Sequence, residues 1–169
     1  MTVVETHRNL APAGPLGFAI LTVSDSRTPE TDSGGRKLRE LAEAAGHRVV
    51  TAEIVKDDLA AIRDATERAL EAEGVDVILL TGGTGVSPRD VTVEAVRPLF
   101  EKELPGFGEI FRMLSYAEVG SAAMLSRATA GIARGRVMFL LPGSPAAVQL
   151  AMERLVLSES GHLLSQVRR

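Results

Sequence analysis

The chain has 169 residues, of which 45% are hydrophobic and 24% charged, and its formal net charge is −3. That length suits one domain with a substantial core, and the slightly acidic chain without a long basic run lacks the clustered cationic face that non-specific DNA or RNA binding needs. The sequence contains no cysteine, which excludes a disulfide framework and a thiolate nucleophile and favours a cytoplasmic protein. No stretch approaches about 18 consecutive apolar residues, so we expect no membrane span.

The first 15 residues mix charged and small residues and lack the apolar core of a signal peptide. We expect residues 1–15 to form a flexible arm and residues 16–169 to form one domain. The apolar run Gly17–Val23 is bounded by turn-forming residues and predicts a buried strand. After a polar loop, apolar residues at helical spacing predict a helix that Gly46 ends.

The next elements repeat this alternation. His47–Val55 predicts a second strand, and either Asp57 or Asp58 caps the helix that follows it. Val75–Leu80 is apolar almost throughout and predicts a third strand. Continuous apolar strands that alternate with amphipathic helices are typical of a parallel sheet covered on both faces.

The second half of the chain begins with two predicted helices, Thr92–Phe100 and Phe107–Val119, separated by a break at Pro105-Gly106. Two strands are predicted next, Ser126–Ile132 and Val137–Leu141, and the turn residues between them have the spacing of a hairpin.

Pro145 suits the first position of a last long helix. The order of elements predicts an α/β domain with three layers, α/β/α, whose mostly parallel sheet carries one antiparallel strand.

Ligands of open α/β sheets bind beyond the carboxyl ends of the strands. This rule selects four loops, Ser24–Gly35, Lys56–Asp58, Gly82–Asp90 and Pro142–Pro145, and the glycines, hydroxyls and carboxylates of the chain concentrate in them. We therefore expect one ligand site built from these loops.

The segment Thr81-Gly-Gly-Thr-Gly85 directly follows the third strand. Its glycines let a ligand approach the backbone, and successive N–H groups in such a loop form an anion nest suited to phosphate. A purely structural turn is equally consistent with this short pattern, which matches neither the Walker A nor the dinucleotide-binding spacing.

In Ser87-Pro-Arg-Asp90, Arg89 is a candidate phosphate ligand and Asp90 a candidate ligand of Mg²⁺. A surface arginine and a helix-capping aspartate are the structural alternatives. Asp57 alone resembles a helix cap, but close to Asp90 it would supply a second carboxylate to a metal.

Weaker candidates lie in the other loops. Ser24-Asp25-Ser26 and Ser33-Gly34-Gly35 form either an anion site or an exposed capping loop. Ser126-Arg127 offers a hydroxyl and a cation, or is a surface pair. Ser144 lacks the surroundings of a nucleophile elbow, and three dispersed histidines make a zinc site improbable.

Laid out in order, these motifs resemble the MoaB/MogA family, which is related to the G domains of plant Cnx1 and of gephyrin. The resemblance spans roughly residues 17–165 and rests on four ordered motif groups. These are Thr22-Val-Ser-Asp25 with Asp32-Ser-Gly34, Thr81-Gly-Gly-Thr-Gly85 with Pro88-Arg-Asp-Val-Thr92 and Glu94-Ala95, Leu125-Ser-Arg127 with Ala130-Gly131, and Leu141-Pro-Gly-Ser-Pro145.

The resemblance implies a protein of molybdenum cofactor biosynthesis that binds molybdopterin and adenylylates its phosphate with Mg-ATP, releasing pyrophosphate. It implies catalytic and Mg²⁺-binding roles for Asp57 and Asp90. The residues expected to bind molybdopterin or its phosphate are Thr81, Gly82, Gly83, Thr84, Gly85, Ser87, Arg89, Ser126 and Arg127. Those assigned to the nucleotide are Ser24, Asp25, Ser33, Gly34, Gly143 and Ser144.

Members of this family are commonly trimers and some are hexamers, so the resemblance implies a homo-oligomer. It also suggests hand-over of the product to a molybdenum-insertion protein. The Ser-Pro pair after Gly143 looks closer to MoaB than to MogA. Two other functions use the same loops, a non-catalytic molybdopterin carrier and an assembly scaffold.

Overall fold

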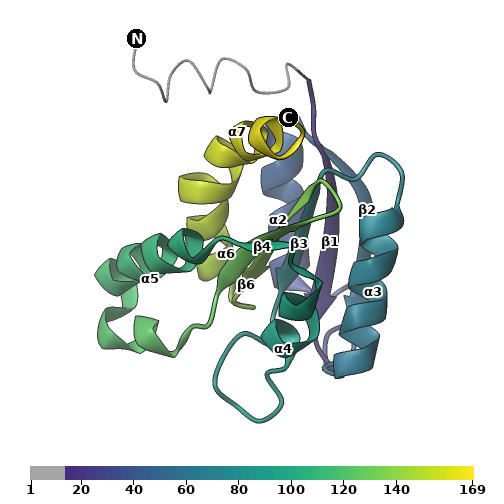
Figure 1. Ribbon diagram of the computed structural model, residues 1–169. Helices are drawn as coiled ribbons and strands as arrows, with labels where there is room; N and C mark the ends of the chain where they lie inside the picture. Colours follow the sequence, from purple (N-terminus) through teal and green to yellow (C-terminus); the bar gives the residue numbers. More distant parts are fainter. Residues whose placement is uncertain (1–13) are drawn as a thin grey trace.

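The computed structural model describes residues 14–169, within which six strands form one sheet of order β2-β1-β3-β6-β5-β4 (Figure 1). The predicted N-terminal arm lies almost wholly outside the described residues. The strands are β1 (Gly17–Val23), β2 (Arg48–Val55), β3 (Val77–Thr81), β4 (Lys102–Glu103), β5 (Thr129–Ala133) and β6 (Arg136–Leu141).

Helices cover both faces of this sheet. Figure 1 shows α2, α5, α6 and α7 on one face and α3 and α4 on the other, and a separate apolar cluster lies under each group. The helices are α2 (Ser33–Ala44), α3 (Leu59–Glu71), α4 (Thr92–Val96), α5 (Pro105–Val119), α6 (Pro145–Ala151) and α7 (Leu157–Val167), with shorter helical turns η1 (Arg97–Leu99), η2 (Gly120–Leu125) and η3 (Met152–Val156). In residues 14–169 no helix is long and apolar enough to cross a membrane.

The predicted strand directions are confirmed. β2, β1, β3 and β6 are mutually parallel, and β5 is antiparallel to both of its neighbours, so it alone runs against the rest of the sheet. The β5–β6 hairpin turns through Arg134 and Gly135, both with positive φ (49° and 72°). Two such residues suit a two-residue hairpin turn, because its twist matches that of the strands.

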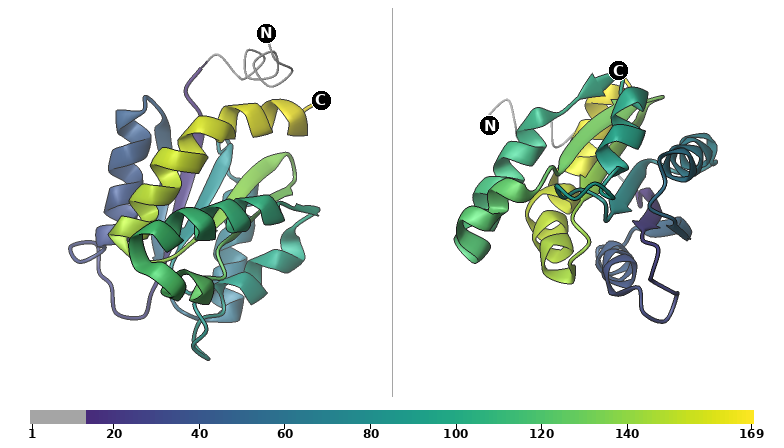
Figure 2. Two further views of the ribbon diagram at one scale, coloured as in Figure 1. Left: turned by 90° about the vertical axis from the view of Figure 1, so that its left-hand side faces the viewer. Right: turned by 90° about the horizontal axis from the view of Figure 1, so that it is seen from below.

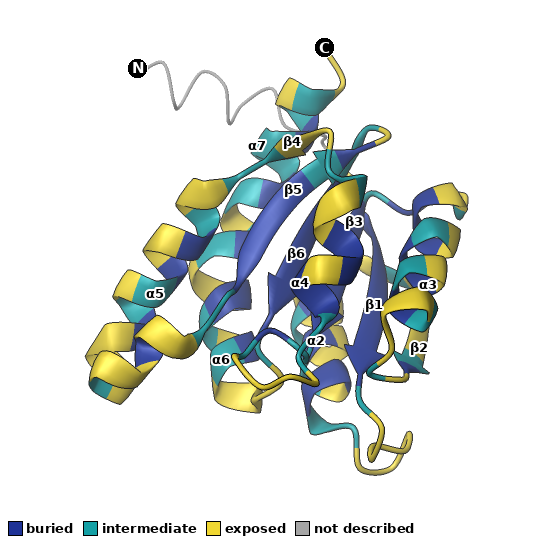
Figure 3. Ribbon diagram, turned by 60° about the horizontal axis from the view of Figure 1, so that its bottom comes forward, coloured by how far each residue is buried: buried dark blue, intermediate teal, exposed yellow. Residues whose placement is uncertain are grey.

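Burial on both faces explains why the central strands β1 and β3 consist almost entirely of apolar residues. Phe18 and Ile20 of β1 pack into the cluster under α2, whereas the alternate residues Ala19 and Leu21 pack into the cluster under α3. Successive side chains of a strand point to opposite faces, so a strand covered on both faces needs no polar side. Figure 3 shows these strands buried between half-exposed helices.

Several elements differ from the sequence expectations, most of them by one or two residues at an end. Helix α5 begins at Pro105 instead of after it, because proline fits the first turn of a helix, where its missing N–H is not needed. β5 begins at Thr129 instead of Ser126, because the 3₁₀ turn η2 precedes it and its C-cap is Ser126. The two-residue strand β4 is too short to leave a recognisable pattern in the sequence.

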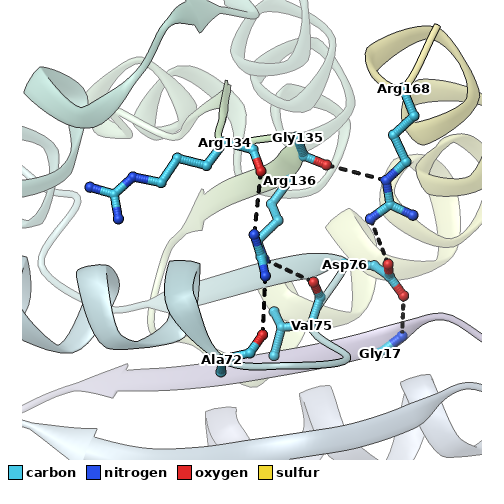
Figure 4. Close-up of polar contacts among 8 residues, drawn as sticks. All are labelled: Gly17, Ala72, Val75, Asp76, Arg134, Gly135, Arg136 and Arg168. Atoms are coloured by element: carbon cyan, nitrogen blue, oxygen red, sulfur yellow. Dashed lines mark hydrogen bonds and ion pairs between the residues drawn. The ribbon is translucent and has the colours of Figure 1, made fainter.

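Charged side chains hold the backbone at the amino ends of the parallel strands (Figure 4). Asp76 accepts hydrogen bonds from the Gly17 N–H at 2.8 Å and from Arg168 at 2.6 Å. Arg136 donates to the carbonyls of Val75 and Ala72. Asp76 and Arg168 therefore join the start of β1 to the segment before β3 and to the end of α7, and Arg136 of β6 binds the end of α3 and the turn after it. The predicted ligand loops lie at the opposite edge of the sheet.

Candidate functional site

The four predicted loops meet at the carboxyl edge of the sheet, seen from below in Figure 2. Backbone hydrogen bonds join them: the Ser24 N–H donates to the Val55 carbonyl at 2.8 Å, and the Gly82 N–H donates to the Leu141 carbonyl at 3.0 Å. The Thr81 hydroxyl donates to the Pro142 carbonyl at 2.9 Å. These contacts confirm the expectation, from strand order alone, that loops far apart in the sequence share one edge.

The glycine loop passes closer to its neighbours than any other residue type allows. Gly82 and Gly83 have φ of +104° and +65°. A Cβ on Gly82 would lie 2.4 Å from the Val23 carbonyl oxygen, and one on Gly83 would lie 2.2 Å from the Thr92 hydroxyl. Both glycines are therefore required by backbone conformation and by contact, whether or not a ligand binds.

Thr92 fastens the loop to the start of α4. Its hydroxyl donates to the Gly82 carbonyl at 2.8 Å, and its N–H donates to the Gly83 carbonyl at 3.1 Å. The sequence reasoning assigned Thr92 no role beyond beginning a helix. Its position directly after Pro88–Val91 carries no local signal of this contact, which depends on how the loop folds back.

Asp90 is not a helix cap. Among the described residues, none caps α4 with a side chain, and its N-cap position is Val91. The Asp90 carboxylate instead accepts a hydrogen bond from the Ser87 N–H at 2.8 Å and lies against Gly85, where a Cβ would come within 2.9 Å of it. The structural alternative that the sequence left open for Asp90 is thereby excluded.

The neighbouring aspartates Asp57 and Asp58 have different environments. Asp58 accepts a hydrogen bond from the Ala61 N–H at 2.9 Å and is the N-cap of α3. Asp57 points to the glycine loop, where its Oδ1 lies 3.3 Å from the position of a Cβ on Gly83. Its own N–H donates to the Asp25 carboxylate at 3.1 Å. The structure thus distinguishes the capping aspartate from the one that faces the site.

Burial raises the pKa of Asp57, and the nearby carboxylates of Asp25 and Asp90 raise it further, while Arg89 opposes them. Arg89 forms an ion pair with Asp25 across the loops. Asp57 therefore lies in the electrostatic field of Asp25 and Asp90, and an additional cation beside it would favour its ionised form.

Asp57 and Asp90 offer two carboxylates, which is enough for a Mg²⁺ ion shared with substrate phosphates but not for a metal site made of protein ligands alone. In residues 14–169 no group of three or more histidine, cysteine, aspartate or glutamate side chains is arranged to hold a metal ion. Mg²⁺ is commonly held by one or two carboxylates together with substrate phosphates and water. Asp57 and Asp90 beside the glycine loop fit that pattern.

A cavity of about 410 Å³ lies on the α2 and α6 side of the glycine loop. Four residues assigned to the nucleotide line it, namely Ser24, Gly34, Gly143 and Ser144. Asp25 lines an adjoining cavity on the β2 side, and Ser33 lines neither. The Ser144 hydroxyl also caps α6 by accepting from the Ala147 N–H at 3.2 Å, which accounts for its place in the turn.

A cavity of about 530 Å³ lies on the other side, between α4, α5 and the start of β5, and Ser126 and Arg127 line it. Arg112, which the sequence reasoning did not select, also lines it and donates to the carbonyls of Ser126 and Ala128. Arg127 forms an ion pair with Glu94. Arg112 is the one cation of α5, and the sequence carries no signal that it faces this cavity.

Comparison with known proteins agrees with this arrangement. Residues 19–162 match the family described as "Probable molybdopterin binding domain". The chain belongs to this family.

The relatives of the chain cover nearly all of it. It is 50% identical to the Molybdenum cofactor biosynthesis protein B of Bacillus cereus, over 100% of this chain and 99% of the relative. A crystal structure of Molybdenum cofactor biosynthesis protein B has a TM-score of 0.90 and 50% identity, over 94% of this chain and 99% of that one. The crystal structure of the tungsten cofactor synthesizing protein MoaB from Pyrococcus furiosus has a TM-score of 0.85 and 41% identity, over 94% of this chain and 100% of that one. The MoaB/MogA resemblance predicted from the motifs is confirmed, and the matched range includes every predicted site residue.

Replacing Asp57 with asparagine is expected to stabilise this family member at neutral pH. Because the pKa of Asp57 is raised in the fold, the folded state binds a proton more tightly than the unfolded chain between the ordinary value of 3.8 and the raised value. Stability is therefore lost as pH rises through that window, and asparagine avoids the loss. We expect a gain of about 1 kcal/mol or less, because the side chain is only partly withdrawn from water.

Thermal unfolding at neutral pH and at about pH 3.5, without metal, measures this effect. The gain should shrink as the pH falls below the ordinary value of 3.8, because Asp57 is then increasingly protonated in both states. Asp58→Ala is the matched control: loss of the α3 cap should lower stability by about 1 kcal/mol. A loss of stability for Asp57→Asn at neutral pH would contradict the electrostatic interpretation of this side chain.

Proposed function

We propose that this protein acts in molybdenum cofactor biosynthesis, binding molybdopterin and transferring an adenylyl group from Mg-ATP to its phosphate. The observation that carries the proposal is that Asp57 lies beside Gly83 and Asp90 beside Gly85, at the edge of the sheet where the other motif loops gather. The names of the close relatives support the cofactor pathway.

The transfer is a substitution at phosphorus. An oxygen of the molybdopterin phosphate bonds to the α-phosphorus of ATP, and the bond from that phosphorus to the bridging oxygen breaks, releasing pyrophosphate. Negative charge gathers on three phosphates, so the protein's task is positioning and electrostatic stabilisation. Bound Mg²⁺ would supply several kcal/mol of that stabilisation. The absence of cysteine fits the absence of a protein nucleophile from this scheme.

Each part of the site has an assigned task. We assign the phosphates to the N–H groups of Gly83, Thr84 and Gly85, because the Gly82 N–H already donates to the Leu141 carbonyl. Mg²⁺ is assigned to Asp57 and Asp90. The nucleotide is assigned to the cavity lined by Ser24 and Gly143, and the pterin to the cavity beside Ser126. This arrangement puts the two substrates on opposite sides of the glycine loop, so that their phosphates meet above it.

The deciding experiment incubates the purified protein with molybdopterin, ATP and Mg²⁺ and looks for adenylylated pterin and pyrophosphate by chromatography. We expect both products, and neither after Mg²⁺ is removed with EDTA. Binding of molybdopterin without product, together with no heat of ATP binding in calorimetry, would instead support the non-catalytic carrier.

We further propose that the protein associates with copies of itself through α5 and η2. Six large apolar side chains on these two elements are at least 44% exposed, namely Ile110, Met113, Tyr116, Val119, Met124 and Leu125. Contiguous apolar surface of this kind typically marks a protein interface. Light scattering of the purified protein is expected to give a multiple of the 17.9 kDa chain mass, and a monomer at micromolar concentration would refute the proposal.

A further inference from the structure

Arg127 is bound to the two ends of the loop that carries Asp90. Its backbone N–H donates to the Thr84 carbonyl at 2.9 Å, and its Nε donates to the Gly85 carbonyl at 2.7 Å. Its Nη2 donates to the Asp90 carbonyl at 2.7 Å. Arg127 thus forms hydrogen bonds with the chain immediately before and immediately after the exposed segment 86–89.

The rest of this segment has few attachments to the fold. Val86, Ser87, Pro88 and Arg89 are all exposed, and Figure 3 shows the loop projecting beside α4. Its internal hydrogen bonds join Ser87 to Asp90 and to the Arg89 N–H. Arg89, 73% exposed, also forms an ion pair with Asp25. Exposed ion pairs of that kind contribute little order. The Asp90 carboxylate is therefore held in place mainly through the backbone that Arg127 fixes.

Glu94 completes the contact. Both of its carboxylate oxygens accept from the Arg127 guanidinium, and this hydrogen bonding lowers the pKa of Glu94, which is therefore ionised at neutral pH. The Arg127 side chain is 34% exposed, less than half the exposure of Arg89. With its three nitrogens all donating to protein oxygens, the guanidinium has little capacity left for a phosphate.

Arg127 and Glu94 also line two cavities at once. They contribute to the cavity beside Ser126 and to a second one of about 450 Å³ under the segment that contains Ser87 and Asp90. The ion pair therefore stands between the pocket assigned to the pterin and the carboxylate assigned to the metal.

We infer that Arg127 is a positioning residue: neutralised by Glu94, it fixes the loop that carries Asp90 and leaves phosphate binding to the backbone N–H groups. This role replaces the direct ligand contact that the sequence suggested for Arg127, and it rests on the proposed adenylyl transfer. A guanidinium is needed because three acceptors lie in different directions, which the single ammonium of lysine does not reach together.

The test compares Arg127→Lys, Arg127→Ala and Glu94→Gln with the wild-type protein in two measurements. The first is amide hydrogen exchange, which we expect to rise about 10-fold or more for residues 86–91 in both Arg127 variants, while the central strands stay protected. The second is steady-state turnover, in which kcat should fall about 10-fold or more with the KM for molybdopterin within about 3-fold of wild type. Glu94→Gln keeps one oxygen that accepts from Arg127. In both measurements this variant should therefore lie between the wild type and the Arg127 variants.

Arg68→Ala is the matched control, since Arg68 pairs with Glu53 on α3 and β2, away from the loop, and should change neither measurement. The inference is overturned if loop exchange is unchanged in both Arg127 variants, or if KM rises while kcat holds, which would make Arg127 a direct ligand of molybdopterin. Hydrogen exchange needs no turnover, so a wild-type protein that forms no product would defeat the proposed reaction while the loop measurement still decides the role of Arg127.

Discussion

Asparagine in place of Asp90 is expected to lower kcat for adenylyl transfer by at least about 100-fold, because a metal ligand that contributes several kcal/mol is lost. The amide oxygen of asparagine has the same position as one carboxylate oxygen and is able to accept the hydrogen bond from the Ser87 N–H. The loop should therefore keep its shape while the charge disappears. Initial rates of adenylylated pterin formation across a range of Mg²⁺ concentrations measure the effect.

Two further variants separate charge from structure. Asp90→Ala removes both the charge and the bond to Ser87, so it should lose activity and also loosen the loop in hydrogen exchange. Asp58→Asn lies at the same edge of the sheet, where Asp58 caps α3, and should leave kcat within about 2-fold of wild type. Wild-type turnover by Asp90→Asn would remove Asp90 from the mechanism.

Among the substitutions considered for stability, alanine in place of Gly82 is expected to lower the free energy of unfolding most. The residue has φ of +104°, and the new Cβ would lie 2.4 Å from the Val23 carbonyl oxygen at the end of β1. Backbone strain and overpacking each cost about 1–3 kcal/mol, so we expect a loss of about 3 kcal/mol or more and a Tm lower by roughly 10 °C. Relief of this contact requires the glycine loop to move, so molybdopterin binding should weaken as well.

Gly106→Ala provides the comparison. Gly106 lies in the first turn of α5, and among the described residues no atom comes within 4 Å of a Cβ built there. Alanine at such a site should be neutral or stabilising by up to about 1 kcal/mol. Chemical denaturation of both variants gives the two free energies, and similar losses for both would show that the special conformation of Gly82 is not responsible.

The strands and the neighbourhood of the loops were readable from residue order. Gly17–Val23 is apolar at every position except Thr22 because both faces of β1 are buried, and the structure gives the strand the same bounds. Alternation with amphipathic helices then implied parallel strands, whose carboxyl ends must lie at one edge. Two of the boundaries that failed lie where a helix begins at a proline, at Pro105, and where a short 3₁₀ turn ends just before Ser126.

The roles of individual polar side chains were not readable in this way. Asp57 and Asp58 are adjacent in sequence and chemically identical, and only the packing of α3 decides which one caps it and which one faces Gly83. Asp90 has the residue type of a cap but turns back to Ser87.

Arg127 has the residue type of a phosphate ligand, yet it is 42 residues from Gly85, whose carbonyl it binds. Hydrophobic periodicity is a local property of the chain, whereas a hydrogen bond between distant loops depends on the whole arrangement of the sheet. The sequence by itself therefore determined the fold and the edge at which the site lies, and the tertiary structure decided which carboxylates face that site and which cation holds its loop in place.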